Sequence, residues 1–154
     1  MKILILTVGK PKDRRISSLA GEYLTRIRPG LVAIESVLDR PDRGGTPEAR
    51  IEREGQEILQ KLRPRDRLIL LSEDGSEYGS KAFAAFLSRE MEIAPGRIVM
   101  AIGGPWGVSG AVKARADLLL SLSPMTFPHE LCFLFLAEQL YRAFSILQGA
   151  SYHH

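Results

Sequence analysis

The sequence has little cysteine and no long apolar run, and both absences exclude classes of protein. One cysteine among 154 residues, Cys132, rules out an internal disulfide and cannot build a cysteine-based zinc site. Cys132 lies in an apolar helical pattern, which favours a buried structural thiol over a nucleophile. The most apolar stretch, residues 131–147, is interrupted by Glu138, Gln139 and Arg142. We therefore expect no membrane-spanning segment and no membrane partner.

Targeting signals and common catalytic motifs are also missing. The first ten residues, MKILILTVGK, hold a short apolar stretch with no cleavage-site pattern after it, so they predict a first strand rather than a secretion signal. No Ser-His-Asp order, HExxH motif, GxGxxG fingerprint or GxxxxGK[ST] loop occurs. Together with the single cysteine, these absences indicate a cytoplasmic protein without a metal site.

The composition is that of an ordinary globular protein, with 45% hydrophobic and 25% charged residues. The length predicts a single domain, residues 1–154, large enough to bury a core. The net charge of +3 is compatible with a polyanionic partner. Basic residues gather after the first expected strand and beside a glycine-rich stretch, where a solvated charged face is the alternative to a binding surface. These residues are Lys10, Lys12, Arg14, Arg15, Arg40, Arg43, Arg50 and Arg53.

Strand-like and helix-like segments alternate along the whole chain. Apolar β-rich runs predict strands at residues 3–8, 31–38, 67–71, 97–102 and 118–122. Apolar residues at helical spacing predict helices at about residues 14–27, 47–62, 80–91, 109–116 and 130–148. The expected N-terminal signals of the first three helices are Asp13, Thr46-Pro47 and Ser80. This alternation predicts an α/β fold with a mostly parallel sheet and helices on both faces.

Three loops follow expected strands, and ligands bind beyond the carboxyl ends of the strands in an open parallel sheet. They are SEDGSEYGS (residues 72–80), GGPWG (103–107) and SPMTFPHEL (123–131). The paired glycines Gly103 and Gly104 let the backbone approach a ligand closely, although a tight turn without a ligand fits the same residues. The two prolines and few charges of the third loop suit either an adenine ring between apolar side chains or a rigid connector.

The last helix and the tail hold the other candidate groups. Glu138 and Arg142 are four residues apart, which favours an intrahelical ion pair and leaves a catalytic arginine as the alternative. Tyr152 can stack on a base, and His153 supplies an imidazole, the side chain that most often moves protons. A chain end without function is the alternative for both residues.

Four motifs follow one another in the last third of the chain. They are IGGPWG (residues 102–107), SLSPMTFPHEL (121–131), AEQLYRA (137–143) and Tyr152-His153. In this order the motifs resemble one family, the bacterial methyltransferases of pseudouridine N3 in large-subunit (23S) ribosomal RNA, which belong to the SPOUT class. The resemblance covers essentially the whole chain.

The resemblance implies a fold, a cofactor and partners. It implies a parallel α/β sheet whose C-terminal segment threads a trefoil knot. It also implies a homodimer in which the RNA site forms where one subunit's cofactor meets the other subunit's tail. The cofactor, S-adenosylmethionine, would lie among the loops after the third, fourth and fifth strands. Its binding residues would be Leu71, Gly103, Gly104, Leu122, Ser123, Pro124, Met125, Thr126 and Phe127.

The resemblance also suggests roles for three residues near the C-terminus. His153 would accept the proton of pseudouridine N3, directly or through water, while Tyr152 positions the base. Arg142 would stabilise negative charge on a carbonyl oxygen or hold a phosphate. The expected substrate is ribosomal RNA in the assembled ribosome. Two alternatives stay open: a methyltransferase of the same fold that acts on transfer RNA, and a ribosome-associated binding protein without catalysis.

Three residues depart from the family pattern. Phe133 stands where an arginine is usual, so we expect one RNA-binding or interface charge to be missing. Trp106 stands between the loop proline and glycine, where an acidic residue is usual. His154 follows the Tyr-His pair, where a lysine or arginine is common.

Overall fold

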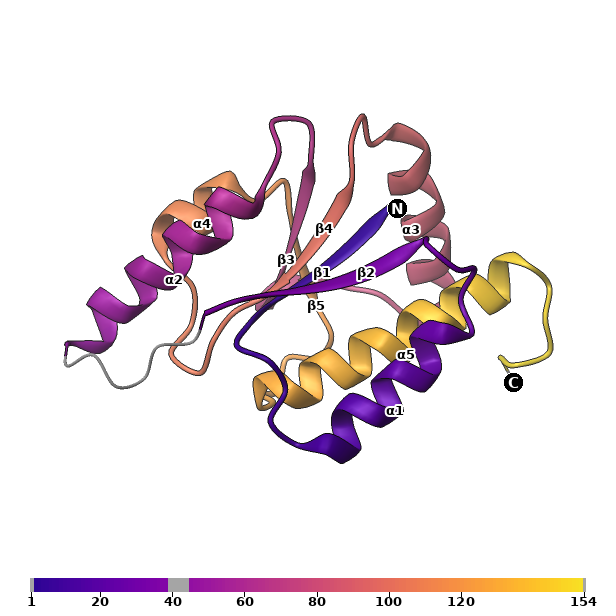
Figure 1. The fold of residues 1–154 in the computed structure, drawn as a ribbon. Helices are drawn as coiled ribbons and strands as arrows, with labels where there is room; N and C mark the ends of the chain where they lie inside the picture. Colours follow the sequence, from indigo (N-terminus) through magenta and orange to yellow (C-terminus); the bar gives the residue numbers. More distant parts are fainter. Residues whose placement is uncertain (1, 39–44, 154) are drawn as a thin grey trace.

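The computed structural model describes residues 2–38 and 45–153, which form one five-stranded sheet and five helices (Figure 1). The glycine-rich stretch with Arg40 and Arg43 falls largely outside the described residues, as does His154. The strands are β1 (Ile3–Val8), β2 (Val32–Val37), β3 (Arg67–Glu77), β4 (Ile98–Ile102) and β5 (Leu118–Ser121). The helices are α1 (Arg14–Thr25), α2 (Pro47–Lys61), α3 (Ser80–Ile93), α4 (Gly110–Arg115) and α5 (His129–Leu147).

All strand pairs in the sheet are parallel, and the strand order is β2-β1-β4-β3-β5. Ile3 of β1 pairs with Val32 on one side and with Ile98 on the other. The order places β4, β3 and β5 next to one another, so their carboxyl ends meet at one edge of the sheet. The prediction of a parallel α/β fold is confirmed, while the trefoil knot stays a prediction.

Helices cover both faces of the sheet, as the sequence predicted (Figure 1). The side chains of β1 alternate between the two layers: Ile3 and Ile5 pack with α1, α3 and α5, whereas Leu4 and Leu6 pack with α2 and α4. All four side chains are fully buried, and each contributes roughly 1.5–3 kcal/mol by its burial. Burial on two faces explains why the strands are almost continuously apolar.

Two of the three predicted helix N-terminal signals are confirmed. The side chains of Asp13 and Thr46 each accept a hydrogen bond from a backbone N–H in the first turn of their helices, at 2.9 and 3.2 Å. The prediction for Ser80 was wrong, because Gly79 is the N-cap and Ser80 is the first helical residue. The Ser80 hydroxyl instead donates to Oε1 of Gln139 on α5, at 2.8 Å.

The third strand is longer than predicted. The sequence placed its end at Leu71, but β3 continues to Glu77 after an irregularity between Leu71 and Ser76. Ser76 and Glu77 pair again with β5, so pairing with a distant strand overrides the loop-like composition of this segment. The irregularity keeps residues 72–75 out of regular pairing, and these residues turn toward the carboxyl edge of the sheet.

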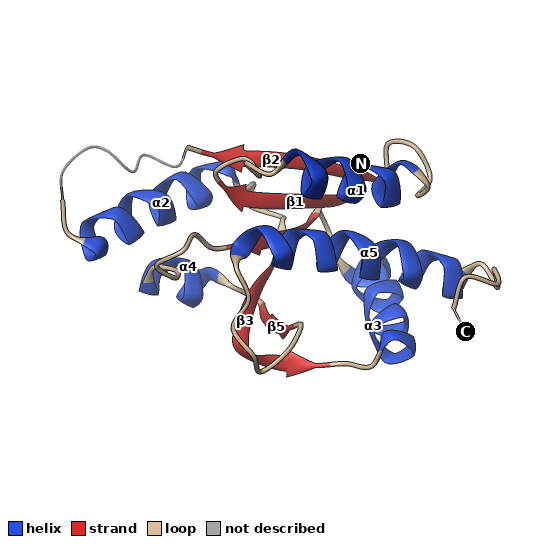
Figure 2. Ribbon diagram, turned by 90° about the horizontal axis from the view of Figure 1, so that it is seen from below, coloured by secondary structure: helices blue, strands red, loops and turns tan. Residues whose placement is uncertain are grey.

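Helix α5 lies on the same face of the sheet as α1 and α3 (Figure 2). Phe133, on α5, is 3% exposed and belongs to the core on this face. The side chain that stands where an arginine is usual is thus part of the protein interior in this chain. None of the helices within residues 2–38 and 45–153 is long and apolar enough to cross a membrane.

Candidate active site

A cavity of about 640 Å³ opens at the carboxyl ends of β4 and β5 and at the irregularity of β3. Its walls come from the loops that follow β4 and β5, from residues 70–74 of β3, from α4 and from the start of α5. This is the position at which open parallel sheets bind ligands, and the volume suits a small organic molecule. The three loops that the sequence analysis selected are therefore brought together around one cavity.

Most of the predicted cofactor-binding residues line this cavity. They are Leu71, Gly103, Gly104, Leu122, Ser123, Met125, Thr126 and Phe127. Pro124 does not line it and instead borders an adjoining hollow of about 330 Å³ beside Glu77 and Ser121. The shared location is a finding of the structure, and the binding role of these residues stays a prediction.

The GGPWG loop is held in a tight turn. The backbone N–H of Gly107 donates to the carbonyl of Gly104 at 3.1 Å, and Gly107 has a φ of 101° that favours glycine. A Cβ at Gly103 would lie 2.5 Å from Cγ2 of Val108, so a side chain cannot fit there without displacing the loop. The tight turn and the cavity wall are thus the same piece of backbone. Trp106, at the tip of the turn, is 56% exposed.

Several cavity-lining residues were not predicted from the sequence. Glu73 and Asp74 contribute carboxylates from the loop after Leu71, and Lys113 contributes an ammonium group from α4. The loop SEDGSEYGS had been selected as a whole, but nothing in its sequence singled out these two acids. The set of apolar walls, two carboxylates and one lysine suits a ligand with a planar ring and charges of both signs.

Cys132 also lines the cavity and is half-buried, so the predicted buried thiol is only partly covered. Its position on the first turns of α5 places it beside Phe127, whose carbonyl oxygen lies 3.8 Å from the sulfur. Burial raises the pKa of the Cys132 thiol, which disfavours the thiolate. A structural thiol thus remains the better interpretation than a nucleophile.

A second cavity of about 590 Å³ adjoins the first. The two share a wall made of Leu120, Leu122, Ser123 and Phe127. From α5 the second cavity receives Phe135, Glu138, Gln139 and Arg142. The rings of Phe127 and Phe135 meet edge to face with centroids 5.2 Å apart, and this pair lies at the boundary between the cavities.

The three predicted catalytic residues lie together near the end of α5. Arg142 donates to Oε1 of Glu138 through Nε at 2.9 Å and Nη2 at 2.5 Å, which confirms the intrahelical ion pair. The Tyr152 hydroxyl donates to the same Oε1 at 3.2 Å, and Nη1 of Arg142 lies 3.4 Å from Nδ1 of His153. The guanidinium carbon of Arg142 is 4.8 Å from the centroid of the Tyr152 ring. We call Arg142, Tyr152 and His153, with Glu138, the C-terminal cluster.

The C-terminal cluster fixes the protonation of two of its members. Burial, a hydrogen bond with Tyr23 and the carboxylate of Glu138 raise the pKa of Tyr152 to about 12. The hydrogen bonds to Glu138 also raise the pKa of Arg142 above its usual value. Near neutral pH, Tyr152 is therefore a hydrogen-bond donor and Arg142 a cation.

The C-terminal cluster and the first cavity lie apart within one chain. His129 lines the cavity, and Arg142 follows thirteen residues later, which corresponds to about 20 Å along α5. The C-terminus lies beyond the far end of α5 from the cavity loops (Figure 1). Among the described residues that line the two cavities, neither Tyr152 nor His153 appears.

Comparison with known proteins places these features in a family. A family model described as "Predicted SPOUT methyltransferase" matches residues 1–153. A protein named Ribosomal RNA large subunit methyltransferase H from Porphyromonas gingivalis (strain ATCC BAA-308 / W83) is 41% identical over 156 residues, covering 100% of this chain and 99% of the relative. Proteins of the same name are 38% identical in Geotalea daltonii, over the full length of both chains, and 42% identical in Solidesulfovibrio magneticus, over 97% of each.

The match extends over the three cavity loops and the C-terminal cluster, and a model of the whole family covers all but the last residue. Full-length identity near 40% recurs in relatives from different bacteria. The chain is an enzyme that belongs to the SPOUT methyltransferase family.

Proposed function

We propose that this chain transfers a methyl group from S-adenosylmethionine to N3 of a pseudouridine in large-subunit (23S) ribosomal RNA, and that it acts in the cytoplasm as a homodimer. The observation that carries the proposal is the cavity formed by the irregular part of β3 and the loops after β4 and β5 in a chain of the SPOUT methyltransferase family. The relatives that match along the full length are named as methyltransferases of large-subunit ribosomal RNA, which supports the choice of substrate.

The residues of the first cavity fit this cofactor. Leu71, Leu122 and Phe127 offer apolar surface for an adenine ring, while Glu73 and Asp74 can accept from hydroxyl or ammonium groups. S-adenosylmethionine would supply a methyl group on a positively charged sulfur, which is a good leaving group. The protein then needs to position the acceptor and to manage one proton and the negative charge that develops.

The C-terminal cluster can perform both tasks. When the methyl group bonds to N3, the N3 proton passes to the imidazole of His153, directly or through a water molecule. Because its pKa is about 12, the Tyr152 hydroxyl stays protonated near neutral pH and offers no phenolate to remove the proton, so Tyr152 positions the base. The Arg142 guanidinium stabilises the negative charge that grows on a neighbouring carbonyl oxygen.

The homodimer follows from the separation of about 20 Å along α5 between the cavity and the C-terminal cluster. A two-fold symmetric pair brings the tail of one protomer to the cavity of its partner without a large movement of either chain. Each active site then combines a cavity from one protomer with a C-terminal cluster from the other.

The first experiment measures methyl transfer from labelled S-adenosylmethionine to three substrates: assembled ribosomes, free 23S ribosomal RNA and transfer RNA. We expect transfer to ribosomes, with N3-methylated pseudouridine as the product. Transfer only to transfer RNA would instead support a methyltransferase of the same fold with another substrate. Failure of the wild-type chain to bind S-adenosylmethionine in calorimetry would contradict the proposal and support a ribosome-associated binding protein.

The role of His153 is tested by His153→Ala. Because a positioned proton acceptor contributes typically 10²–10⁴-fold, we expect turnover on ribosomes to fall at least about 100-fold. Affinity for S-adenosylmethionine should stay near the wild-type value in calorimetry, because the imidazole lines neither cavity of its own chain. Unchanged turnover would remove His153 from the mechanism.

A mixture of two inactive variants tests the shared site. Gly103→Val removes cofactor binding by the cavity, and His153→Ala removes the proton acceptor of the tail, so each homodimer is inactive. Co-expressed in equal amounts, the two variants form heterodimers with one intact site, and we expect about a quarter of the wild-type turnover. No recovery in heterodimers isolated by two affinity tags would mean that cavity and tail act within one chain.

A further inference from the structure

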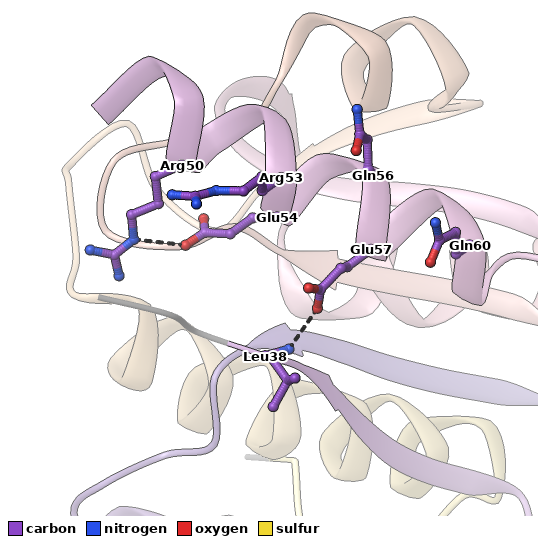
Figure 3. Close-up of a pocket in the computed structure, with 7 residues that line it drawn as sticks. All are labelled: Leu38, Arg50, Arg53, Glu54, Gln56, Glu57 and Gln60. Atoms are coloured by element: carbon purple, nitrogen blue, oxygen red, sulfur yellow. Dashed lines mark hydrogen bonds and ion pairs between the residues drawn. The ribbon is translucent and has the colours of Figure 1, made fainter. Parts of the chain in front are cut away.

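A buried carboxylate lies behind the GGPWG loop, outside the cavity that the loop lines. Glu54, on α2, is 4% exposed, and its Oε1 accepts from Nε of Arg50 at 3.0 Å (Figure 3). The other oxygen, Oε2, is buried and has no hydrogen-bond partner among residues 2–38 and 45–153. A buried oxygen of a charged group without a partner is rare, and it calls for a functional explanation.

The unpartnered oxygen faces the glycine loop. A Cβ at Gly104 would lie 2.8 Å from Oε2 of Glu54 and 3.2 Å from Cγ1 of Val8. Gly104 also lines the 640 Å³ cavity. Only the backbone of the loop therefore stands between this carboxylate and the cavity.

The surroundings leave the Glu54 charge poorly screened toward the cavity. Oε2 is buried from solvent, and a charge in such surroundings acts more strongly on its neighbours than it does in water. Arg50 binds Oε1 and so offsets part of the charge, while it also fixes the carboxylate with Oε2 toward Gly104. A negative potential in the cavity raises the affinity of any ligand that carries an additional positive charge there.

We propose that Glu54 adds to the charge specificity that Glu73, Asp74 and Lys113 give the cavity wall: its buried carboxylate, placed against Gly104, favours a cationic ligand over its neutral counterpart. This inference rests on the proposed function, because the proposed donor carries a positive sulfonium. Transfer moves the methyl group to the acceptor, and the sulfur keeps the bonding electron pair and becomes a neutral thioether in S-adenosylhomocysteine. The cavity thus binds the donor more tightly than the product, and the loss of charge promotes product release.

The alternative is a purely structural role for Glu54. A structural carboxylate would lower the melting temperature and the affinity for both ligands together when it is replaced. A charge-selective carboxylate behaves differently, because its replacement acts on the two ligands unequally. Its neutral replacement changes the ratio of the two affinities, whatever the loss of the ion pair with Arg50 does to the melting temperature.

The test measures the affinities for S-adenosylmethionine and S-adenosylhomocysteine by calorimetry, and the melting temperature, for the wild-type protein and for Glu54→Gln. We expect the amide to weaken S-adenosylmethionine binding about tenfold and S-adenosylhomocysteine binding less than about twofold. Equal weakening for both ligands, and so an unchanged ratio, would overturn the proposal, whereas a lower melting temperature alone would report the lost ion pair with Arg50.

Two further variants keep the test decisive. Glu54→Asp retains the charge, so the ratio of the two affinities should return toward the wild-type value even where both affinities change; a ratio like that of Glu54→Gln would contradict the proposal. Glu57→Gln removes one charge from the same helix. Glu54 and Glu57 both line a hollow of about 270 Å³ on the outer side of α2, where Glu57 accepts from the backbone N–H of Leu38 at 3.0 Å (Figure 3). Glu57→Gln should leave the ratio unchanged.

The outcome separates this inference from the proposed function. A wild-type protein that binds neither ligand overturns the proposed cofactor, whatever Glu54 does. Normal wild-type binding with an unaltered ratio in Glu54→Gln overturns only the role of Glu54.

Discussion

The first cavity and the C-terminal cluster differ in the kinds of groups that form them. The cavity is shaped by backbone and apolar walls, and its central loop tolerates no side chain at Gly103. The C-terminal cluster consists of polar side chains that satisfy one another, with Glu138 accepting from both Arg142 and Tyr152. The backbone gives the cavity its shape before any ligand arrives, whereas the cluster must exchange internal hydrogen bonds for bonds to its substrate.

This difference predicts how the two regions respond to substitution. Changes in the cavity should alter ligand affinity, because shape and backbone position determine the fit. Changes in the cluster should alter turnover with little effect on cofactor affinity, because its residues line neither the first cavity nor the glycine loop. The following variants test that division, in order of decreasing effect.

The largest effect is expected for Gly103→Val. The new side chain would collide with Val108, because even its Cβ would lie 2.5 Å from Cγ2 of that residue. Calorimetry should show affinity for S-adenosylmethionine at least about 100-fold weaker, since overpacking distorts the loop that lines the cavity. Gly110→Ala is the matched control, because its Cβ would meet nothing within 4 Å at the start of α4. Loss of binding in the control as well would show that the region tolerates no change of any kind.

A smaller effect is expected for Arg142→Ala. Removal of a charged hydrogen-bond donor from the transition state should lower turnover about 30-fold, while the affinity for S-adenosylmethionine stays near the wild-type value. Arg142→Lys keeps the charge without the fork-shaped donor set, and it should recover only part of the loss. A parallel decrease of cofactor affinity and turnover would contradict the division between the two regions.

Tyr152→Phe should have a modest effect on stability and turnover. It removes one hydrogen bond to Glu138 at 3.2 Å, while the ring can still pack edge to face against Tyr141 at a centroid distance of 4.6 Å. Chemical denaturation at pH 7 should show a loss of at most about 1 kcal/mol in the free energy of unfolding. Turnover should fall a few-fold, because the base loses one positioning contact; a loss comparable to that of His153→Ala would assign Tyr152 a role in proton transfer.

The last test follows the alkaline stability profile. The folded state raises the pKa of Tyr152 to about 12, above the value of about 10 for an unfolded tyrosine. The protonated phenol is therefore favoured by folding, and this contribution is complete below pH 10 and lost as the pH rises from 10 to 12. The difference in the free energy of unfolding between the wild-type protein and Tyr152→Phe should shrink over that interval. A difference that grows with pH would mean that the phenolate is the favoured form.

Sequence patterns predicted the architecture and the three loops because both depend on local signals. Apolar runs that end at glycine, as at Ile102-Gly103, indicate both a buried strand and the loop after it. The continuation of β3 to Glu77 was missed because it depends on pairing with β5, which no local pattern reveals. The cofactor-binding residues came from the family resemblance; Pro124 is the one among them that borders the adjoining hollow, and its role stays a prediction.

The sequence did not predict how the helices lie across the sheet. Glu54 occupies an ordinary position in an amphipathic helix, and only the packing of α2 behind Gly104 reveals its unpartnered oxygen. The separation between the first cavity and His153 depends in the same way on the course of α5 along the sheet. Periodicity shows which side of a helix is apolar, but it does not show which loop lies opposite a given side chain.

The exposed tip of the GGPWG loop carries an intrinsic fluorophore. Trp106 is the single tryptophan of the chain, and it lies two residues after Gly104 with more than half of its surface in solvent. Tryptophan emission from the unlabelled enzyme therefore comes from this loop alone. Mixing with cofactor in a stopped-flow instrument can follow how fast the loop responds to occupancy, without an added dye that would alter the cavity.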